Sequence, residues 1–401
     1  MVAGGPAGPC ARLQIKRNGR TPAILNRKRK HDFNEELEFD ISAATESTEK
    51  MTVDDNIFSP ENTTTMKTTW SRFRALTTLP MLPVTKSSPL PNLTWADSHE
   101  VWDLMIKKDM KYKRDSNVLR QHPSIEAGMR SILLDWLIEV CEVYRLHRDT
   151  YYLCLDFIDR FLATQFNLPK SQLQLVGITA LFLAAKIEEI YPPKLSEFAY
   201  VTDGACTENE ILEKELIILR ALNWDLSPVT VQGWINTFLQ ISNLKNIKDV
   251  STNFVIPQYS GYTIVQISQL VDLCMLDIGN LSFAYSIIAA SALYHVTSKD
   301  LTFRVSGYKW ADIHECVQWM SPFAATTREH GPAQPKYFEQ ISDYDMHNIQ
   351  THTADLTIHL QDAQARLSCV YTKDNPDFMT PHKSYDKNCL DVTDDEDDDI
   401  F

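Results

Sequence analysis

The chain has 401 residues, 44% of them hydrophobic, and a formal net charge of −14. This length allows about two or three domains, and the apolar content is sufficient for buried cores. The negative charge repels phosphate backbones and no uncharged apolar run approaches about 20 residues, so we expect neither direct nucleic-acid binding nor a membrane segment.

Residues 1–90 form an N-terminal region rich in Ser, Thr, Pro, Asn and charge. Such a region cannot bury enough apolar surface to offset its ordering entropy, and we expect it to be disordered. It contains one compact basic cluster, made of Arg27, Lys28, Arg29 and Lys30. We interpret the cluster as a nuclear import signal, with a phosphate-binding patch or a plain solvated charge run as alternatives. Nuclear localisation is therefore expected.

The segment 91–225 shows helical periodicity in quick succession. A first helix begins near Ser98, a second carries apolar residues at i, i+3, i+4 and i+7, and further helices follow over 149–162 and 196–200. The four apolar residues are Met129, Ile132, Leu133 and Trp136. The same helix has a second apolar stripe. Either the helix is wholly buried, which is the simpler interpretation, or one stripe is an exposed surface for a partner peptide.

The helix over 169–186 is apolar nearly all round and contains several small residues. Such a helix normally lies at the centre of a bundle, surrounded by its neighbours. Pro192-Pro193 ends this part of the pattern. Thr207 and Glu210 then have the spacing of a capping box, which predicts the start of a last helix that runs to Leu222.

A second block, 226–330, repeats this organisation. Helices are predicted over 228–239, 262–276, 283–296 and 310–323, and the third of them is again rich in Ala. No stretch shows sustained period-2 alternation, so the predicted fold class is all-α. Residues 331–401 form a C-terminal tail in which one more helix is expected between 342 and 366, before a polar and acidic end.

Several motifs resemble the cyclin family. Met129–Leu137 resembles the opening helix of the cyclin box, and Lys186–Pro193 resembles the motif that follows the family's third helix. Other segments are similar to E-type cyclins: Leu146–Tyr152, Tyr200–Cys206, Leu270–Cys274, Cys316–Phe323 and His347–His352. The resemblance implies two tandem five-helix cyclin-box domains, over 91–225 and 226–330, with an N-terminal helix and disordered tails.

The resemblance also implies roles for individual residues. A hydrophobic docking patch for Arg-x-Leu substrates and kinase inhibitors would comprise Met129, Ile132, Leu133, Trp136, Glu139, Leu173 and Gln174. Lys186 and Glu215 match the pair that contacts the kinase. Without the resemblance, Lys186 would be interpreted as a solvated cation at a helix C-terminus. Arg130 and Asp159 match a structural ion pair between the first two helices.

One motif imitates a catalytic site. His147-Arg148-Asp149 copies the catalytic loop of a protein kinase, but Cys154 stands where a kinase needs an Asn for its second magnesium ion. We expect no catalysis, and Asp149 instead to cap the second helix of the first block. The eight cysteines form no Cys-x-x-Cys pair and no His or acidic cluster has ligand spacing, so neither a metal nor a cofactor is expected.

The C-terminal tail contains Thr380 and Ser384 in a Thr-Pro-x-x-Ser spacing. This spacing resembles the phosphodegron of E-type cyclins, which implies recognition by a phosphodegron-reading ubiquitin ligase through Arg side chains. The chain departs from the family pattern at His382, where the family has a second proline, and this weakens the match.

Three functions follow as hypotheses. The first is a regulatory subunit that binds and activates a kinase similar to cyclin-dependent kinase 2, recruits its substrates and controls the G1/S transition and S-phase entry. The second is a transcription adaptor with the cyclin fold, which the acidic balance disfavours. The third is an enzyme, for which the sequence has no complete set of catalytic residues.

Overall fold

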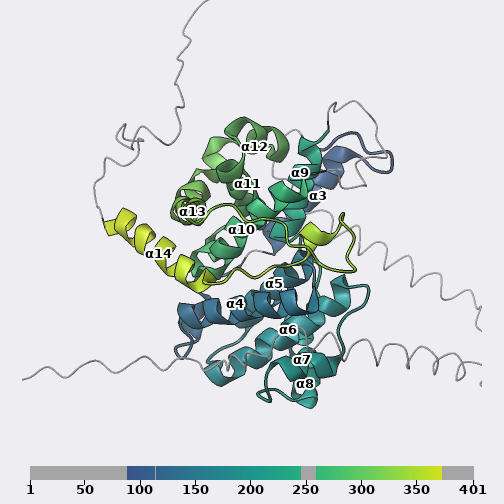
Figure 1. Ribbon diagram of the computed structural model, residues 1–401, viewed down its shortest axis with the longest axis vertical. Coiled ribbons are helices and arrows are strands. Elements are labelled where there is room, and N and C mark those ends of the chain that lie inside the picture. Colours follow the sequence, from purple (N-terminus) through teal and green to yellow (C-terminus); the bar gives the residue numbers. More distant parts are fainter. Residues whose placement is uncertain (1–87, 113, 245–258, 373–401) are drawn as a thin grey trace, which may run out of the picture.

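The computed structural model describes residues 88–112, 114–244 and 259–372 (Figure 1). Within these ranges the chain is helical, without a β-strand and with one isolated backbone bridge, between His147 and Ile349. Two bundles of five helices follow an N-terminal helix. The predicted fold class, all-α with two tandem five-helix units, is confirmed.

The N-terminal helix α3 (Ser98–Lys111) starts where the sequence indicates. The carboxylate of Asp97 accepts hydrogen bonds from the backbone N–H groups of His99 and Glu100, which have no partner inside the helix. Trp102 on this helix packs edge-on against Trp234 of the second bundle, with ring centroids 5.5 Å apart. Helix α3 therefore precedes the first bundle in sequence but packs against the second.

The first bundle is built around one helix. Its members are α4 (Ala127–Tyr144), α5 (Arg148–Thr164), α6 (Leu173–Glu188), α7 (Leu195–Val201) and α8 (Glu208–Ala221), with short 3-10 turns at Val118–Gln121 and Lys170–Gln172. Helix α6 is buried from Leu173 to Ala185 apart from Gln174, as its apolar sequence predicts. Gly177 lets α4 approach closely, since a Cβ at this position would lie 2.7 Å from a methyl group of Leu133.

The second bundle repeats the plan with different residues. It contains α9 (Val231–Ser242), α10 (Gly261–Leu276), the 3-10 helix η4 (Ile278–Ser282), α11 (Tyr285–Val296), α12 (Lys299–Ser306) and α13 (Trp310–His330). The Ala-rich helix α11 packs against α9, α10, α12 and α13, so it has the central place that α6 has in the first bundle.

Several helix boundaries differ from the sequence prediction. Helix α9 begins after Thr230, whose hydroxyl accepts a hydrogen bond from Gly233 N–H, and not at Pro228. Helix α13 continues to His330, about two turns beyond the predicted end. The predicted helix over 342–366 starts only at Leu356, as α14 (Leu356–Thr372), because Asp355 before it has the left-handed φ of 66°. Helix α12 was not predicted.

Residues 331–355, which we call the strap, connect α13 to α14. The strap crosses the boundary between the bundles, and α14 then packs against α13, α10 and α4 (Figure 1). Gln350 N–H donates to the carbonyl of Leu146 at 2.9 Å, between α4 and α5. Part of the predicted C-terminal tail, up to Thr372, is thus an ordered element that touches both bundles.

Candidate functional site

Lys186 and Glu215 meet at one end of the first bundle. Lys186 lies in the last turn of α6, and its ammonium group forms an ion pair with the Glu215 carboxylate on α8. The Lys186 nitrogen also lies 4.4 Å from the ring centroid of Phe182. The Lys186 side chain is 39% exposed and that of Glu215 is 11% exposed. The Lys186 ammonium is thus accessible to a partner, while the less exposed Glu215 carboxylate holds it in position.

Exposed apolar side chains lie close in sequence to both members of this ion pair. Ile190 and Tyr191, just after α6, are 86% and 91% exposed, and Leu212 and Leu216 lie on the outer face of α8. Large apolar side chains that gather at one surface mark sites of protein–protein contact. Sequence reasoning missed these residues. The available signal was α8 itself, which has an outer apolar pair at i, i+4 in addition to its buried residues.

The seven residues assigned to the docking patch divide into a buried base and an accessible rim. Leu133, Trp136 and Leu173 are buried, and they hold α4 against α6. The accessible residues are Met129, Ile132, Glu139 and Gln174. Ile132 is 37% exposed, and Glu139 makes no hydrogen bond or ion pair with any described residue. The patch therefore offers apolar surface and one carboxylate on a rigid helix.

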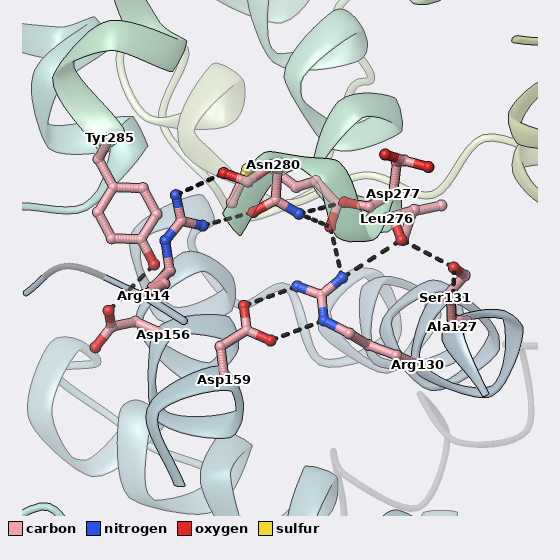
Figure 2. A network of polar contacts seen from close by, with 11 residues as sticks. Arg114, Ala127, Arg130, Ser131, Asp156, Asp159, Leu276, Asp277, Asn280 and Tyr285 are labelled. Atoms are coloured by element: carbon pink, nitrogen blue, oxygen red, sulfur yellow. Dashed lines mark hydrogen bonds and ion pairs between the residues drawn. The ribbon is translucent and has the colours of Figure 1, made fainter. Parts of the chain in front are cut away.

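Arg130 and Asp159 form a buried, bidentate ion pair between α4 and α5 (Figure 2). The Arg130 Nε and Nη2 atoms donate to the two carboxylate oxygens of Asp159, each at 2.7 Å. Arg130 Nη1 continues to the carbonyl of Met275, at 3.1 Å, at the end of α10. Ser131 next to it donates to the carbonyl of Leu276 at 2.8 Å. The pair therefore joins the two bundles as well as two helices.

A second buried arginine, Arg114, acts at the same boundary. Its guanidinium group donates to the side chain of Asn280 at 2.5 Å and stacks 4.0 Å from the ring centroid of Tyr285 (Figure 2). It also donates to the carbonyl of Phe283 at 2.7 Å. The Tyr285 hydroxyl donates to Asp156 of α5 at 3.1 Å. Sequence reasoning missed Arg114 because a lone arginine before a helix gives no sign of a partner 166 residues away.

In the His147-Arg148-Asp149 motif, the first two side chains make structural contacts. Arg148 is 1% exposed, and its guanidinium group donates to Asp272 of α10 and to Gln350 of the strap, both at 3.2 Å. Asp149 does not cap α5, as the sequence suggested, since the helix begins at Arg148 with His147 in the cap position. Burial, reinforced by the nearby carboxylate of Glu188, raises the pKa of Asp149 to about 6.

His147 connects the end of α6 to the strap. Its Nδ1 lies 2.7 Å from Glu189 and its Nε2 lies 3.0 Å from Asp345. The hydrogen bond with Glu189 raises the pKa of His147 to about 9, against the opposing effect of burial and with a further contribution from Asp345. The ring is therefore charged at neutral pH and makes two ion pairs.

Two other histidines of the strap have separate partners. His352 Nε2 lies 2.9 Å from Asp135 on α4, whereas His347 packs its ring against Tyr259. No group of three or more His, Cys, Asp or Glu side chains that could hold a metal ion occurs in the described part of the chain. In the same residues, no helix is long and apolar enough to cross a membrane.

Some predicted residues lie outside the described ranges. These are the basic cluster of Arg27, Lys28, Arg29 and Lys30, together with Thr380, Ser384 and His382. Their roles remain predictions from the sequence.

Comparison with known proteins identifies the family. Residues 100–227 match the family "Cyclin, N-terminal domain" and residues 230–355 match "Cyclin, C-terminal domain". These two matches correspond to the two bundles, and the second also covers the strap.

Full-length relatives agree with these matches. The chain is 53% identical to G1/S-specific cyclin-E of Hemicentrotus pulcherrimus over 324 residues, which is 80% of this chain and 76% of that protein. It is 55% identical to G1/S-specific cyclin-E1 of Gallus gallus over 282 residues, or 70% and 68% of the two chains. It is also 44% identical to G1/S-specific cyclin-E of Drosophila melanogaster, of which it covers 44%. The chain belongs to the cyclin family and, within it, to the G1/S-specific cyclin-E group.

Proposed function

We propose that this cyclin is a non-catalytic subunit that holds its kinase through the face around Lys186 and Glu215 and recruits substrates through the docking patch. As a member of the cyclin-E group, it is a cell-cycle cyclin that activates a cyclin-dependent kinase at the G1/S transition. The observation that carries the proposal is the accessible Lys186–Glu215 pair, with exposed apolar side chains close to both residues in sequence. The partner we propose is a kinase similar to cyclin-dependent kinase 2.

The chemistry of this face suits a protein partner. Ile190, Tyr191 and Leu216 present apolar surface that is exposed in the free chain, and its burial would supply the main driving force for association. The Lys186 ammonium, held over Phe182 and against Glu215, supplies a positioned donor in addition to this apolar surface. A fixed donor on a rigid helix end loses little side-chain entropy when it binds.

The docking patch suits a short Arg-x-Leu peptide. Ile132 and Met129 offer partly exposed apolar contacts for a leucine side chain, and the unpaired carboxylate of Glu139 can accept hydrogen bonds from an arginine. The buried residues beneath, including Trp136, keep this surface rigid. We propose that substrates and kinase inhibitors with such motifs bind here.

The absence of catalysis by the chain itself is part of the proposal. Arg148 of the His-Arg-Asp motif is buried and bound to Asp272, and Cys154 is a buried thiol on α5. A kinase needs an Asp free to accept the substrate proton and an Asn for magnesium at these positions. Cys154 cannot supply the magnesium ligand, and the buried Arg148 is held by Asp272.

We propose that the tails control where the protein acts and for how long. The basic cluster from Arg27 to Lys30 would direct nuclear import. Phosphorylated Thr380 and Ser384 would present about three to four negative charges to a phosphodegron-reading ubiquitin ligase. His382 in place of the second proline predicts weaker recognition than in relatives with the full motif.

Co-expression with a cyclin-dependent kinase 2-like subunit tests the proposal. The wild-type chain should co-purify with the kinase and allow it to phosphorylate histone, whereas either protein alone should not. The double variant Lys186→Ala/Glu215→Ala should lose most of this activation. A matched control, Lys299→Ala/Glu315→Ala, removes one exposed cation and one exposed anion from the second bundle and should behave as wild type. Full activation by the first double variant would refute the assigned contact.

A further inference from the structure

Helix α4 carries three carboxylates on one face beside the docking patch. Asp135, Glu139 and Glu142 are separated by four and three residues, a spacing that places their side chains next to one another on a helix. Glu139 is also a member of the docking patch. An arginine bound at Glu139 would therefore lie one helical turn from each of the other two carboxylates.

The strap binds the two outer carboxylates, Asp135 and Glu142, but forms no hydrogen bond or ion pair with the middle one, Glu139. His352 Nε2 lies 2.9 Å from Asp135, and the backbone N–H of His352 donates to Glu142. Lys336 adds an ion pair with Glu142 at 2.7 Å, and its ammonium also donates to the carbonyl of His352 at 2.9 Å. Glu139 has neither a hydrogen bond nor an ion pair within the described ranges.

These contacts also decide which carboxylates are accessible. The side chains of Asp135 and Glu142 are 11% and 26% exposed, whereas Glu139 is exposed. Charge from all three reaches the strap, since Asp135, Glu139 and Glu142 together raise the pKa of His352 against the effect of its burial. The strap thus converts a stripe of three anions into a single accessible one.

We propose that the strap determines the specificity of the docking patch by binding Asp135 and Glu142, so that the patch favours peptides with one basic residue over peptides with several. This inference rests on the proposed docking function and names the chemistry of its ligand. Without Lys336 and His352, the uncovered carboxylates would attract additional cations that flank an Arg-x-Leu core. The strap lies 194 to 217 residues away from these carboxylates in sequence, so the selectivity arises only in the folded chain.

Two fluorescent peptides with the same Arg-x-Leu core measure this selectivity. One has serine flanks and the other has lysine flanks, and their dissociation constants are measured by anisotropy with the full-length chain. The ratio of the two constants isolates the effect of the flanking charge. Lys336→Ala should shift this ratio toward the lysine-flanked peptide by about two- to five-fold, the range of partly exposed ion pairs. His352→Ala, which removes the ring that contacts Asp135, should shift it in the same direction.

A reciprocal variant and a charge-matched control complete the test. Lys336→Ala combined with Glu142→Gln should return the ratio to the wild-type value, because the uncovered carboxylate is gone. Lys299→Ala, an equal change of net charge on α12, should leave the ratio unaltered. An unchanged ratio in Lys336→Ala and His352→Ala, or an equal shift in Lys299→Ala, overturns the inference. Failure of wild type to bind the serine-flanked peptide would instead overturn the docking function itself.

Discussion

The first bundle contains two ion pairs that join residues 29 apart in sequence but have opposite surroundings. Arg130 and Asp159 are 0% and 1% exposed, and the guanidinium group has four acceptors, two of them main-chain carbonyls of the second bundle. Lys186 and Glu215 are 39% and 11% exposed, and the ammonium has one acceptor among the described residues, the Glu215 carboxylate.

This difference separates a pair that holds the fold from a pair that is available to a partner. A buried charge that loses its partner has no water to replace it, so both members of the first pair are needed together. An exposed pair contributes little to stability because water solvates either member alone. The following predictions use that difference, beginning with the largest expected effect.

Arg130→Ala should destabilise the chain by about 3–5 kcal/mol, because it leaves the Asp159 carboxylate without its bidentate donor in the interior. Urea unfolding followed by circular dichroism measures this loss. A double variant, Arg130→Met/Asp159→Leu, removes both charges and should recover a large part of the stability. A loss below about 1 kcal/mol in Arg130→Ala would show that the pair is not needed for the fold.

Arg114→Ala should cost less, about 1–3 kcal/mol, since the groups it leaves unpaired are neutral. The carbonyl of Phe283 and the side chain of Asn280 lose hydrogen bonds, and Tyr285 loses its stacked guanidinium group. Thermal unfolding compared with Arg120→Ala, an arginine without these contacts, provides the measurement. Equal melting temperatures of the two variants would argue against a structural role for Arg114 at the boundary between the two bundles.

The charged form of His147 should give the strap a pH-dependent contribution. Its pKa is about 9 in the folded chain and 6.5 without neighbours, so the contribution is fully present below pH 6.5 and is lost as the pH rises through about 9. Relative to His147→Gln, we expect an advantage of wild type of about 1 kcal/mol near neutral pH, modest because the ring is partly exposed. Urea titrations of both proteins at several pH values should show the curves converging above pH 9. A constant difference would contradict the assigned charge.

Lys186→Ala should have the smallest effect on stability, at most about 1 kcal/mol. The same change should weaken kinase binding, because it removes the positioned donor of the proposed kinase contact. Differential scanning fluorimetry gives the first quantity and an affinity measurement with the kinase gives the second. A large drop in melting temperature would place this pair in the same structural class as Arg130 and Asp159.

Local features of the fold could be predicted from the sequence. The continuous apolar character of α6 identified a central helix, and the Thr207–Glu210 spacing identified the start of α8, where both hydrogen bonds of the capping box are present. Such features depend on residues within one or two turns. Helix α12 was not predicted, because it is short and its start is marked mainly by the Ser298 cap.

Contacts between distant segments could not be predicted in this way. Arg114 and the strap residue Lys336 are ordinary surface-type residues in sequence, and their partners lie 166 and 194 positions away. The exposed apolar residues near Lys186 escaped for a related reason, since periodicity alone cannot tell an outer apolar pair such as Leu212 and Leu216 from a buried one.

The most direct test of the difference between the structural pair and the partner-binding pair uses the variant Lys186→Ala/Glu215→Ala. Its affinity for the kinase is measured together with its melting temperature. We predict at least about a ten-fold loss of kinase affinity, as for an interface hot spot, with a nearly unchanged melting temperature. Full kinase affinity, or a loss of affinity explained by unfolding of the variant, would contradict it.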